Sequence, residues 1–273
     1  MISPQIGSRT AVALCLIAGV ACASSPRAVP PPTPASSSKT APDIIDGAGV
    51  VRAMNARYAG KWYSTLTFSQ TTTITRPTGT LVQTWLEAAK LPGRLRIDTD
   101  SLGQTGVIYT GDSSYSFSAG KLAGVRPGRN DLLVLGFDVY AQPPEVTIAV
   151  LRGGGVDMSK MHRTTWEGRP VFVVGAAEGD WTSKQFWVDE ERLLFVRLLQ
   201  QTTLQTGPRS DDIRFQKYVA HGGGWVAEEV VMLSDGKPRL HEEYANVRIN
   251  VKLADGLFDP KMWAEMKGWF YRQ

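Results

Sequence analysis

Three groups of neighbouring acidic residues are candidates for acid–base hydrolysis, which commonly needs two carboxylates. Three acids at positions 189–191 fall in a predicted turn, where charges are usually solvated. Glu228 and Glu229, and likewise Glu242 and Glu243, fall in predicted strands, where neighbours point to opposite faces of a sheet. A Glu that points to the concave face, Glu228 or Glu243, could serve as the carboxylate of a glycosidase. The alternative is that an inward charge protects a sheet edge or forms a polar rim.

Other catalytic and metal-binding patterns find no match. His162, His221 and His241 are widely spaced and stand in no H-x-x-x-H frame, and the sequence has no G-x-S-x-G nucleophile elbow. The glycine runs at 153–155 and 222–224 lack the Lys-Ser/Thr of a phosphate-binding loop. We therefore predict a protein that is not an enzyme, with no catalytic residue, no metal and no cofactor.

Both cysteines, Cys15 and Cys22, lie in an N-terminal segment with the features of an export signal, predicted to span residues 1–22. One basic residue precedes an apolar run at 11–20 that is too short to cross a bilayer. Cleavage at the A-x-A site 21–23 would release a soluble periplasmic protein. Alternatively, residues 19–22 resemble the lipobox of bacterial lipoproteins, although Gly19 stands where an aliphatic residue is usual. In that case Cys22 carries the lipid anchor.

Residues 23–42 are rich in Ser, Pro and Ala and are predicted to form a disordered tether. Such a tether favours the lipoprotein alternative, because a flexible segment can link a domain to a membrane anchor, whereas a soluble domain has no need of one. Residues 43–273 suffice for one large domain, which has no cysteine pair for a disulfide. The formal net charge of +4 comes from interspersed residues, so we expect no nucleic-acid binding.

Hydrophobic periodicity predicts a mainly β fold. An apolar stripe indicates a helix over 43–58, capping residues and Pro144 indicate two short helices within 130–151, and Asp259 and Pro260 open a last one. So long a meander must curl, so we expect one large curved antiparallel sheet with a few helices inside it. Five strands are predicted before the helical insertion and seven after it, at 62–74, 80–87, 94–99, 106–110, 114–118, 161–166, 170–176, 182–188, 193–202, 212–219, 225–234 and 239–253.

Large aromatic side chains are spread over nearly every predicted strand. A few short helices cannot fill the whole concave face, so the remainder would form an apolar pocket able to hold an acyl chain. Each buried CH₂ of such a ligand would contribute ~0.8 kcal/mol. The predicted ligand-pocket residues are Trp62, Phe68, Trp85, Phe172, Phe186, Phe215 and Trp225.

Three short motifs resemble the LolA/LolB-like superfamily of periplasmic lipoprotein carriers and receptors. Residues 66–70 match its Phe-x-Gln strand opening, 186–197 its F-W-hydrophobic-D hairpin, and 253–260 its L-x-D-x-x-F-x-P signature. The resemblance implies an unclosed half-barrel with helices lidding an apolar concave face. LolA carriers have an Arg before the Pro of the third strand, where this chain has Leu91. The anchor and tether make the chain more similar to the LolB receptor.

We therefore expect a monomeric, exported bacterial envelope protein that binds acyl chains or lipoproteins, with roles in lipoprotein sorting or lipid handling. Its partners would be those acyl chains and the membrane surface that Cys22 reaches. It would be an outer-membrane lipoprotein facing the periplasm, or a soluble periplasmic protein if cleaved after Ala23. The alternative is a sensory or protein-interaction module on the same fold, without lipid transfer.

Overall fold

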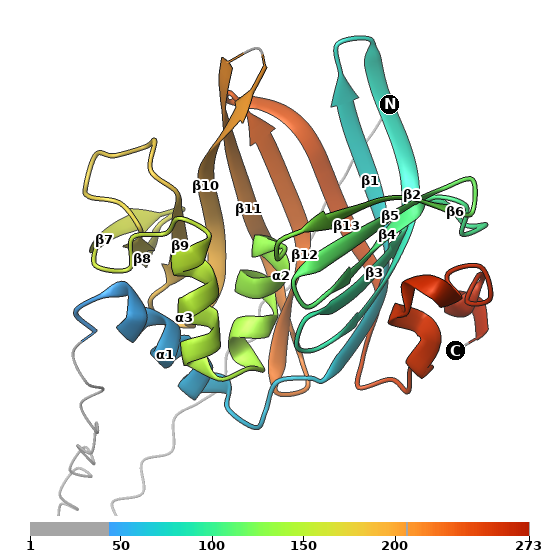
Figure 1. The fold of residues 1–273 in the computed structure, drawn as a ribbon. Helices are drawn as coiled ribbons and strands as arrows, with labels where there is room; N and C mark the ends of the chain where they lie inside the picture. The colour runs from blue at the N-terminus through green and yellow to red at the C-terminus, as the bar shows by residue number, and fades with distance from the viewer. Residues whose placement is uncertain (1–43, 206, 273) are drawn as a thin grey trace, which may run out of the picture. The chain divides into compact units, whose positions relative to one another are not determined.

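The first and last strands of the chain pair side by side in the middle of one antiparallel sheet (Figure 1). The computed structural model describes residues 44–205 and 207–272, so the predicted signal, the tether and Cys22 lie outside the described residues. Thirteen strands follow the order β6-β5-β4-β3-β2-β1-β13-β12-β11-β10-β9-β8-β7. This confirms the predicted curved antiparallel sheet, unclosed, with β6 and β7 as its edges.

Six strands precede the helical insertion rather than five. The missed strand, β6 (Lys121–Pro127), is exposed at every residue because it is an edge strand, so its sequence carries no period of two. The others are β1 (Thr65–Arg76), β2 (Gly79–Lys90), β3 (Arg94–Asp98), β4 (Gly106–Thr110), β5 (Ser113–Ser118), β7 (Met161–Trp166), β8 (Arg169–Val174), β9 (Gln185–Asp189), β10 (Phe195–Leu204), β11 (Gly207–His221), β12 (Gly224–Ser234) and β13 (Lys237–Ile249).

The helix predicted over 43–58 begins at Gly47, and the two short helices of the insertion are present. Asp46 caps α1 (Gly47–Tyr58) by accepting a hydrogen bond from the Gly49 amide, and Asn130 caps α2 (Asp131–Gly136). The 3₁₀ turn η1 (Asp138–Tyr140) and α3 (Pro144–Gly153) follow. No helix in the described part of the chain is both long and apolar enough to cross a membrane.

The C-terminal segment forms three 3₁₀ turns rather than the single helix predicted from Pro260: η2 (Asp255–Phe258), η3 (Pro260–Met262) and η4 (Trp269–Arg272). They lie on the outer face of β2–β5. Trp263 stacks on Phe117 with ring centroids 4.1 Å apart. The guanidinium carbon of Arg96 lies 4.0 Å from the ring centroid of Trp263. Burial of these large side chains against the sheet, rather than an amphipathic stripe, decides the conformation here.

The inner face carries the main core, between the helices and β8–β12. Helix α1 contributes Val51 and Met54, and α3 contributes Leu151. A second cluster gathers Leu133 of α2 with side chains of β1–β3. The helices thus cover one part of the concave face and are tightly packed there.

Candidate functional site

The seven aromatic residues predicted to line a pocket are divided among several environments. Phe172, Phe186 and Phe215 are buried in the main core beneath the helices. Phe68 is buried in the second cluster, where its ring stacks on Tyr244 with centroids 4.2 Å apart. These four side chains contact protein groups of the packed part of the face.

The three tryptophans are only partly buried. Trp62 stacks on Tyr140 of η1 at a centroid distance of 4.0 Å, and Trp225 lies 5.8 Å from the guanidinium carbon of Arg192. Trp85 lies on β2, on the same face as Phe68 but further along the strands. The role of these seven residues in ligand binding stays a prediction.

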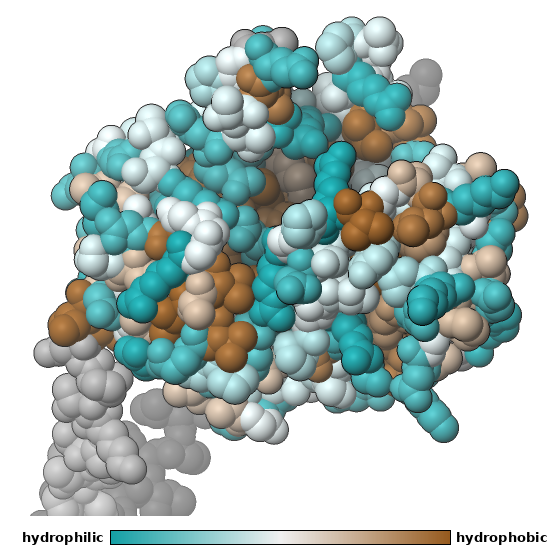
Figure 2. Space-filling view, in the orientation of Figure 1, coloured by the Kyte–Doolittle hydropathy of each residue, from teal (hydrophilic) through white to brown (hydrophobic). Residues whose placement is uncertain are grey.

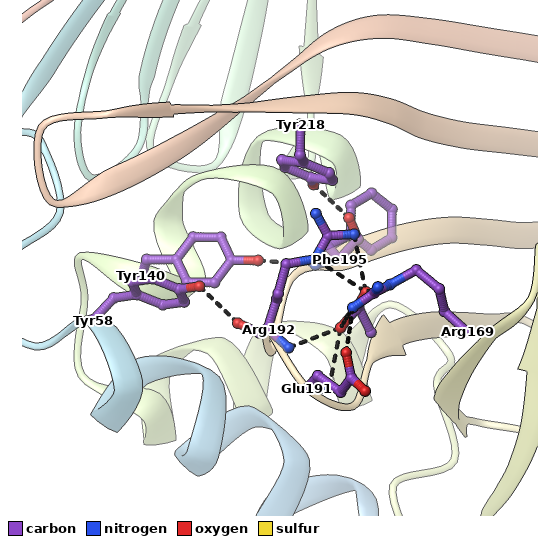
Figure 3. Close-up of polar contacts among 8 residues, drawn as sticks. Tyr58, Tyr140, Arg169, Glu191, Arg192, Phe195 and Tyr218 are labelled. Atoms are coloured by element: carbon purple, nitrogen blue, oxygen red, sulfur yellow. Dashed lines mark hydrogen bonds and ion pairs between the residues drawn. The ribbon is translucent and has the colours of Figure 1, made fainter. Parts of the chain in front are cut away.

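Three tyrosine hydroxyls tie the helices and β11 to the β9–β10 hairpin (Figure 3). Tyr58 of α1 donates to the Arg192 carbonyl at 2.6 Å, and Tyr140 of η1 accepts from the Phe195 amide at 2.9 Å. Tyr218 of β11 donates to the Phe195 carbonyl. Because both helical elements are fixed to one hairpin, this part of the concave face is held closed.

The hairpin is itself held by Asp189, which is 1% exposed and not solvated as the turn position suggested. Arg169 Nε lies 2.5 Å and Arg192 Nε 3.2 Å from its Oδ2 atom (Figure 3). Although burial opposes ionisation, hydrogen bonds from Arg169 and Arg192 hold the pKa of Asp189 below its usual value. The acids at 189–191 therefore include a structural anchor rather than a catalytic pair.

The rest of the concave face is open. Figure 2 shows the surface hollowed between the β10–β11 and β1–β2 hairpins, above α2 in this view, with hydrophobic residues at depth. Ile74 pairs with Leu240, which in turn pairs with Met232, so the three form one row across β1, β13 and β12. All three side chains are partly exposed. This apolar row is the part of the inner face that the helices leave uncovered.

Polar residues adjoin the apolar row on the same face. We call Gln70, Thr72, Glu87, Glu242 and Tyr244 the concave-face cluster. Register places Gln70 opposite both Tyr244 and Trp85, and Thr72 opposite Glu242. Gln70, Thr72, Glu87 and Glu242 are 1%, 0%, 6% and 7% exposed, so this polar group is deeply buried.

The hydrogen bonds of the cluster leave acceptors in excess. Tyr244 donates to Glu242 Oε2 at 3.1 Å, and Gln70 Nε2 donates to Thr72 Oγ1 at 2.8 Å. The buried Gln70 Oε1 has no hydrogen-bond partner among the described residues. Burial raises the pKa of Glu87 well above its usual range, and the Glu242 carboxyl raises it further. Burial raises the pKa of Glu242 to about 7, although hydrogen bonds from Tyr244 and Gln70 oppose the shift.

Sequence reasoning missed this cluster, although the alternation of β1 contained the signal. Gln70 and Thr72 occupy the inward positions of β1 between Phe68 and Ile74. Glu87 was not considered. A polar residue at an inward position is the observation that could have found the site.

The two glycosidase candidates are not brought together as a pair. Glu228 lies 3.0 Å from His221 Nε2, and Glu243 is exposed beside Glu229 and His241 on the outer face. Ligand-type atoms of Glu229, His241 and Glu243 lie within 4.8 Å of one another. Lys217 Nζ is 2.8 Å from Glu229 Oε1, so this group already has a counter-charge.

Two small cavities lie near the β7 edge of the sheet. One, of about 100 Å³, is bordered by Trp166, Arg169 and Tyr218, and the other, of about 260 Å³, by His162 and Trp181. Ligand pockets usually measure about 300–1,000 Å³. Each of these cavities is too small for a long acyl chain, so the open concave face remains the better candidate.

The fold defines a class: an unclosed antiparallel half-barrel with helices on its concave face. No known family profile and no curated protein sequence matches the chain. Among solved structures it is similar to a DUF1329 family protein from Desulfovibrio piger, at 14% identity and a TM-score of 0.53, covering 80% of this chain and 97% of that one.

A putative outer membrane lipoprotein-sorting protein domain from Vibrio parahaemolyticus is similar at 10% identity and a TM-score of 0.53, covering 80% of this chain and 98% of that one. A LolA superfamily protein from Nitrosomonas europaea covers 76% of this chain and 96% of its own at 10% identity, with a TM-score of 0.46. The predicted resemblance to the LolA/LolB-like superfamily is confirmed at the level of the fold.

Proposed function

We propose that this is an exported envelope protein that binds acyl chains, of lipids or of lipoproteins, on the open part of its concave face. The observation that carries the proposal is the apolar row of Ile74, Leu240 and Met232, which stays partly exposed on the inner face of the sheet.

The physical basis is the hydrophobic effect. An acyl chain laid along the row would remove its own CH₂ groups and the three side chains from water, at ~0.8 kcal/mol for each CH₂. The fold neighbour named as an outer membrane lipoprotein-sorting protein supports an envelope role. It supports it only through a shared fold, since the identity is 10%.

The proposed location of the protein depends on Cys22. Lipidation there would hold the domain at the outer membrane through the 23–42 tether, whose coil length corresponds to roughly 22–27 Å in r.m.s. terms. Mass spectrometry of the mature N-terminus tests this part. A diacylated Cys22 is expected, and an unmodified chain starting at Ser24 would make the protein a free periplasmic carrier.

The binding proposal is tested with purified protein and a fluorescent fatty acid, together with lipid extraction and native mass spectrometry. Leu240→Asp places a charge in the apolar row and is expected to weaken probe binding at least tenfold. Leu122→Asp is the matched control, because Leu122 is 53% exposed on the edge strand β6 and should leave binding unchanged. Absence of both co-purified lipid and probe binding in the wild type would contradict the proposal.

A protein-interaction role is favoured by a different observation. Trp181 is 61% exposed beside the cavity of about 260 Å³ and far from the apolar row in the sheet order. Pull-downs from envelope extract separate the two functions. A partner retained by Leu240→Asp but lost by Trp181→Ala would favour the interaction module.

A further inference from the structure

The concave-face cluster holds a buried hydrogen-bond acceptor that no group of the described residues satisfies. The Gln70 amide donates a hydrogen bond to Thr72, and the Tyr244 hydroxyl donates one to Glu242. The unpartnered Gln70 Oε1 then remains, in a region where burial makes an unsatisfied acceptor costly. Such an acceptor is complementary to a ligand that brings a hydrogen-bond donor.

The cluster also lacks a counter-charge. Neither Glu87 nor Glu242 forms an ion pair with any residue in 44–205 or 207–272. The nearest bases along the neighbouring strands, His241 of β13 and Arg96 of β3, each contact a carboxylate on the outer face. Both acids are buried on the concave face without such a partner, so a ligand that stabilises their ionised forms is positively charged.

Aromatic rings lie beside the concave-face cluster. Tyr244 stacks on Phe68, and Trp85 lies across from Gln70 in the β1–β2 pairing. A cation near the faces of such rings gains a further electrostatic attraction, which is largest where water is excluded. Acidic oxygens with aromatic neighbours are a recurrent way of recognising ammonium groups.

The apolar row adjoins the cluster, because Ile74 follows Thr72 and Leu240 precedes Glu242 at the next inward positions of their strands. We propose that the concave-face cluster binds the ammonium group of a cationic amphiphile whose apolar chain lies along Ile74, Leu240 and Met232. This inference rests on the proposed acyl-chain binding and adds the chemical class of the headgroup.

Three probes of one chain length test the inference: decylammonium, decanol and decanoate, each below its micelle concentration and competing with the fluorescent fatty acid at pH 8. The full chain is expected to bind decylammonium at least tenfold more tightly than decanol, and decanoate most weakly. The double variant Glu87→Gln/Glu242→Gln should reduce the ammonium preference to less than twofold while still binding decanol.

Glu243→Gln is the matched control, because Glu243 adjoins Glu242 in sequence but is exposed on the outer face. It should keep the full ammonium preference. Equal binding of decylammonium and decanol by the wild type would overturn the headgroup inference and leave acyl-chain binding intact. Binding of none of the three probes would instead overturn the proposed function itself.

Discussion

Glu87 of β2 and Glu242 of β13 lie on the two strands that flank β1, and the charge of the Glu242 carboxyl disfavours ionisation of Glu87. Both are buried on the concave face. The folded protein therefore holds protons that the unfolded chain, with ordinary glutamates, releases at lower pH. Stability must then depend on pH in a direction that these two residues set.

Glu242→Gln is expected to stabilise the protein at high pH. The native pKa of Glu242 is raised from 4.5 to about 7, so the native state binds more protons than the unfolded state between these values, and wild-type stability falls as pH rises through them. One pKa unit corresponds to ~1.4 kcal/mol, so the variant should gain up to ~3 kcal/mol above pH 7 and almost nothing below pH 4.5. Urea unfolding from pH 4 to 8 measures this.

The exposed neighbour Glu243 is the control, and Glu243→Gln should follow the wild-type curve at every pH. A wild type whose stability rises between pH 5 and 7 while Glu242→Gln stays flat would contradict the assignment.

Tyr140→Phe is expected to destabilise the packed part of the concave face. The variant removes the oxygen that accepts from the buried Phe195 amide, and an unpaired buried donor costs ~1–3 kcal/mol. Tyr271→Phe, at a tyrosine that is 67% exposed, should change the free energy of unfolding by less than ~0.5 kcal/mol. Equal stability of the two variants would show that the hydrogen bond to the β9–β10 hairpin contributes nothing.

Gly47→Ala is expected to destabilise by overpacking. A Cβ atom at Gly47 would lie 2.3 Å from Val174 Cγ1, so α1 or β8 must shift, at a cost of ~1–3 kcal/mol. Adding Val174→Ala should recover part of the loss compared with Val174→Ala alone. Gly153→Ala in α3 is the control, since its Cβ would meet open space. Thermal unfolding of the four variants compares them, and additive losses would argue against the contact.

Trp85→Ala is expected to weaken binding of the fluorescent fatty acid about fivefold, because a half-buried aromatic side chain contributes ~1 kcal/mol of apolar contact. Trp181→Ala removes a tryptophan near the β7 edge and should leave the affinity unchanged. The opposite ranking would move the acyl-chain site from the concave face to the cavity beside Trp181.

Local chemistry made several elements predictable. Asn130 and Asp259 accept backbone hydrogen bonds at helical starts, as their residue types predict, and Pro144 lies in the first turn of α3. The β period could be read where one strand face is buried and the other exposed. It could not be read in β6, where both faces meet water.

The candidate site was predicted only in outline. Phe172, Phe186 and Phe215 were expected as pocket wall, but α1, η1 and α3 pack on the surrounding core. The path of the helical insertion over the sheet depends on contacts such as Tyr140 with Phe195, which join residues distant in sequence. The uncovered part of the face is set by that packing.

The sequence by itself determined the β-rich fold and caps such as Asn130, because these depend on residues close together in the chain. The tertiary structure alone decided which carboxyls face inward. Glu87 and Glu242 lie on the same face only because β2 and β13 both pair with β1, and strand register assigns each side chain to one face.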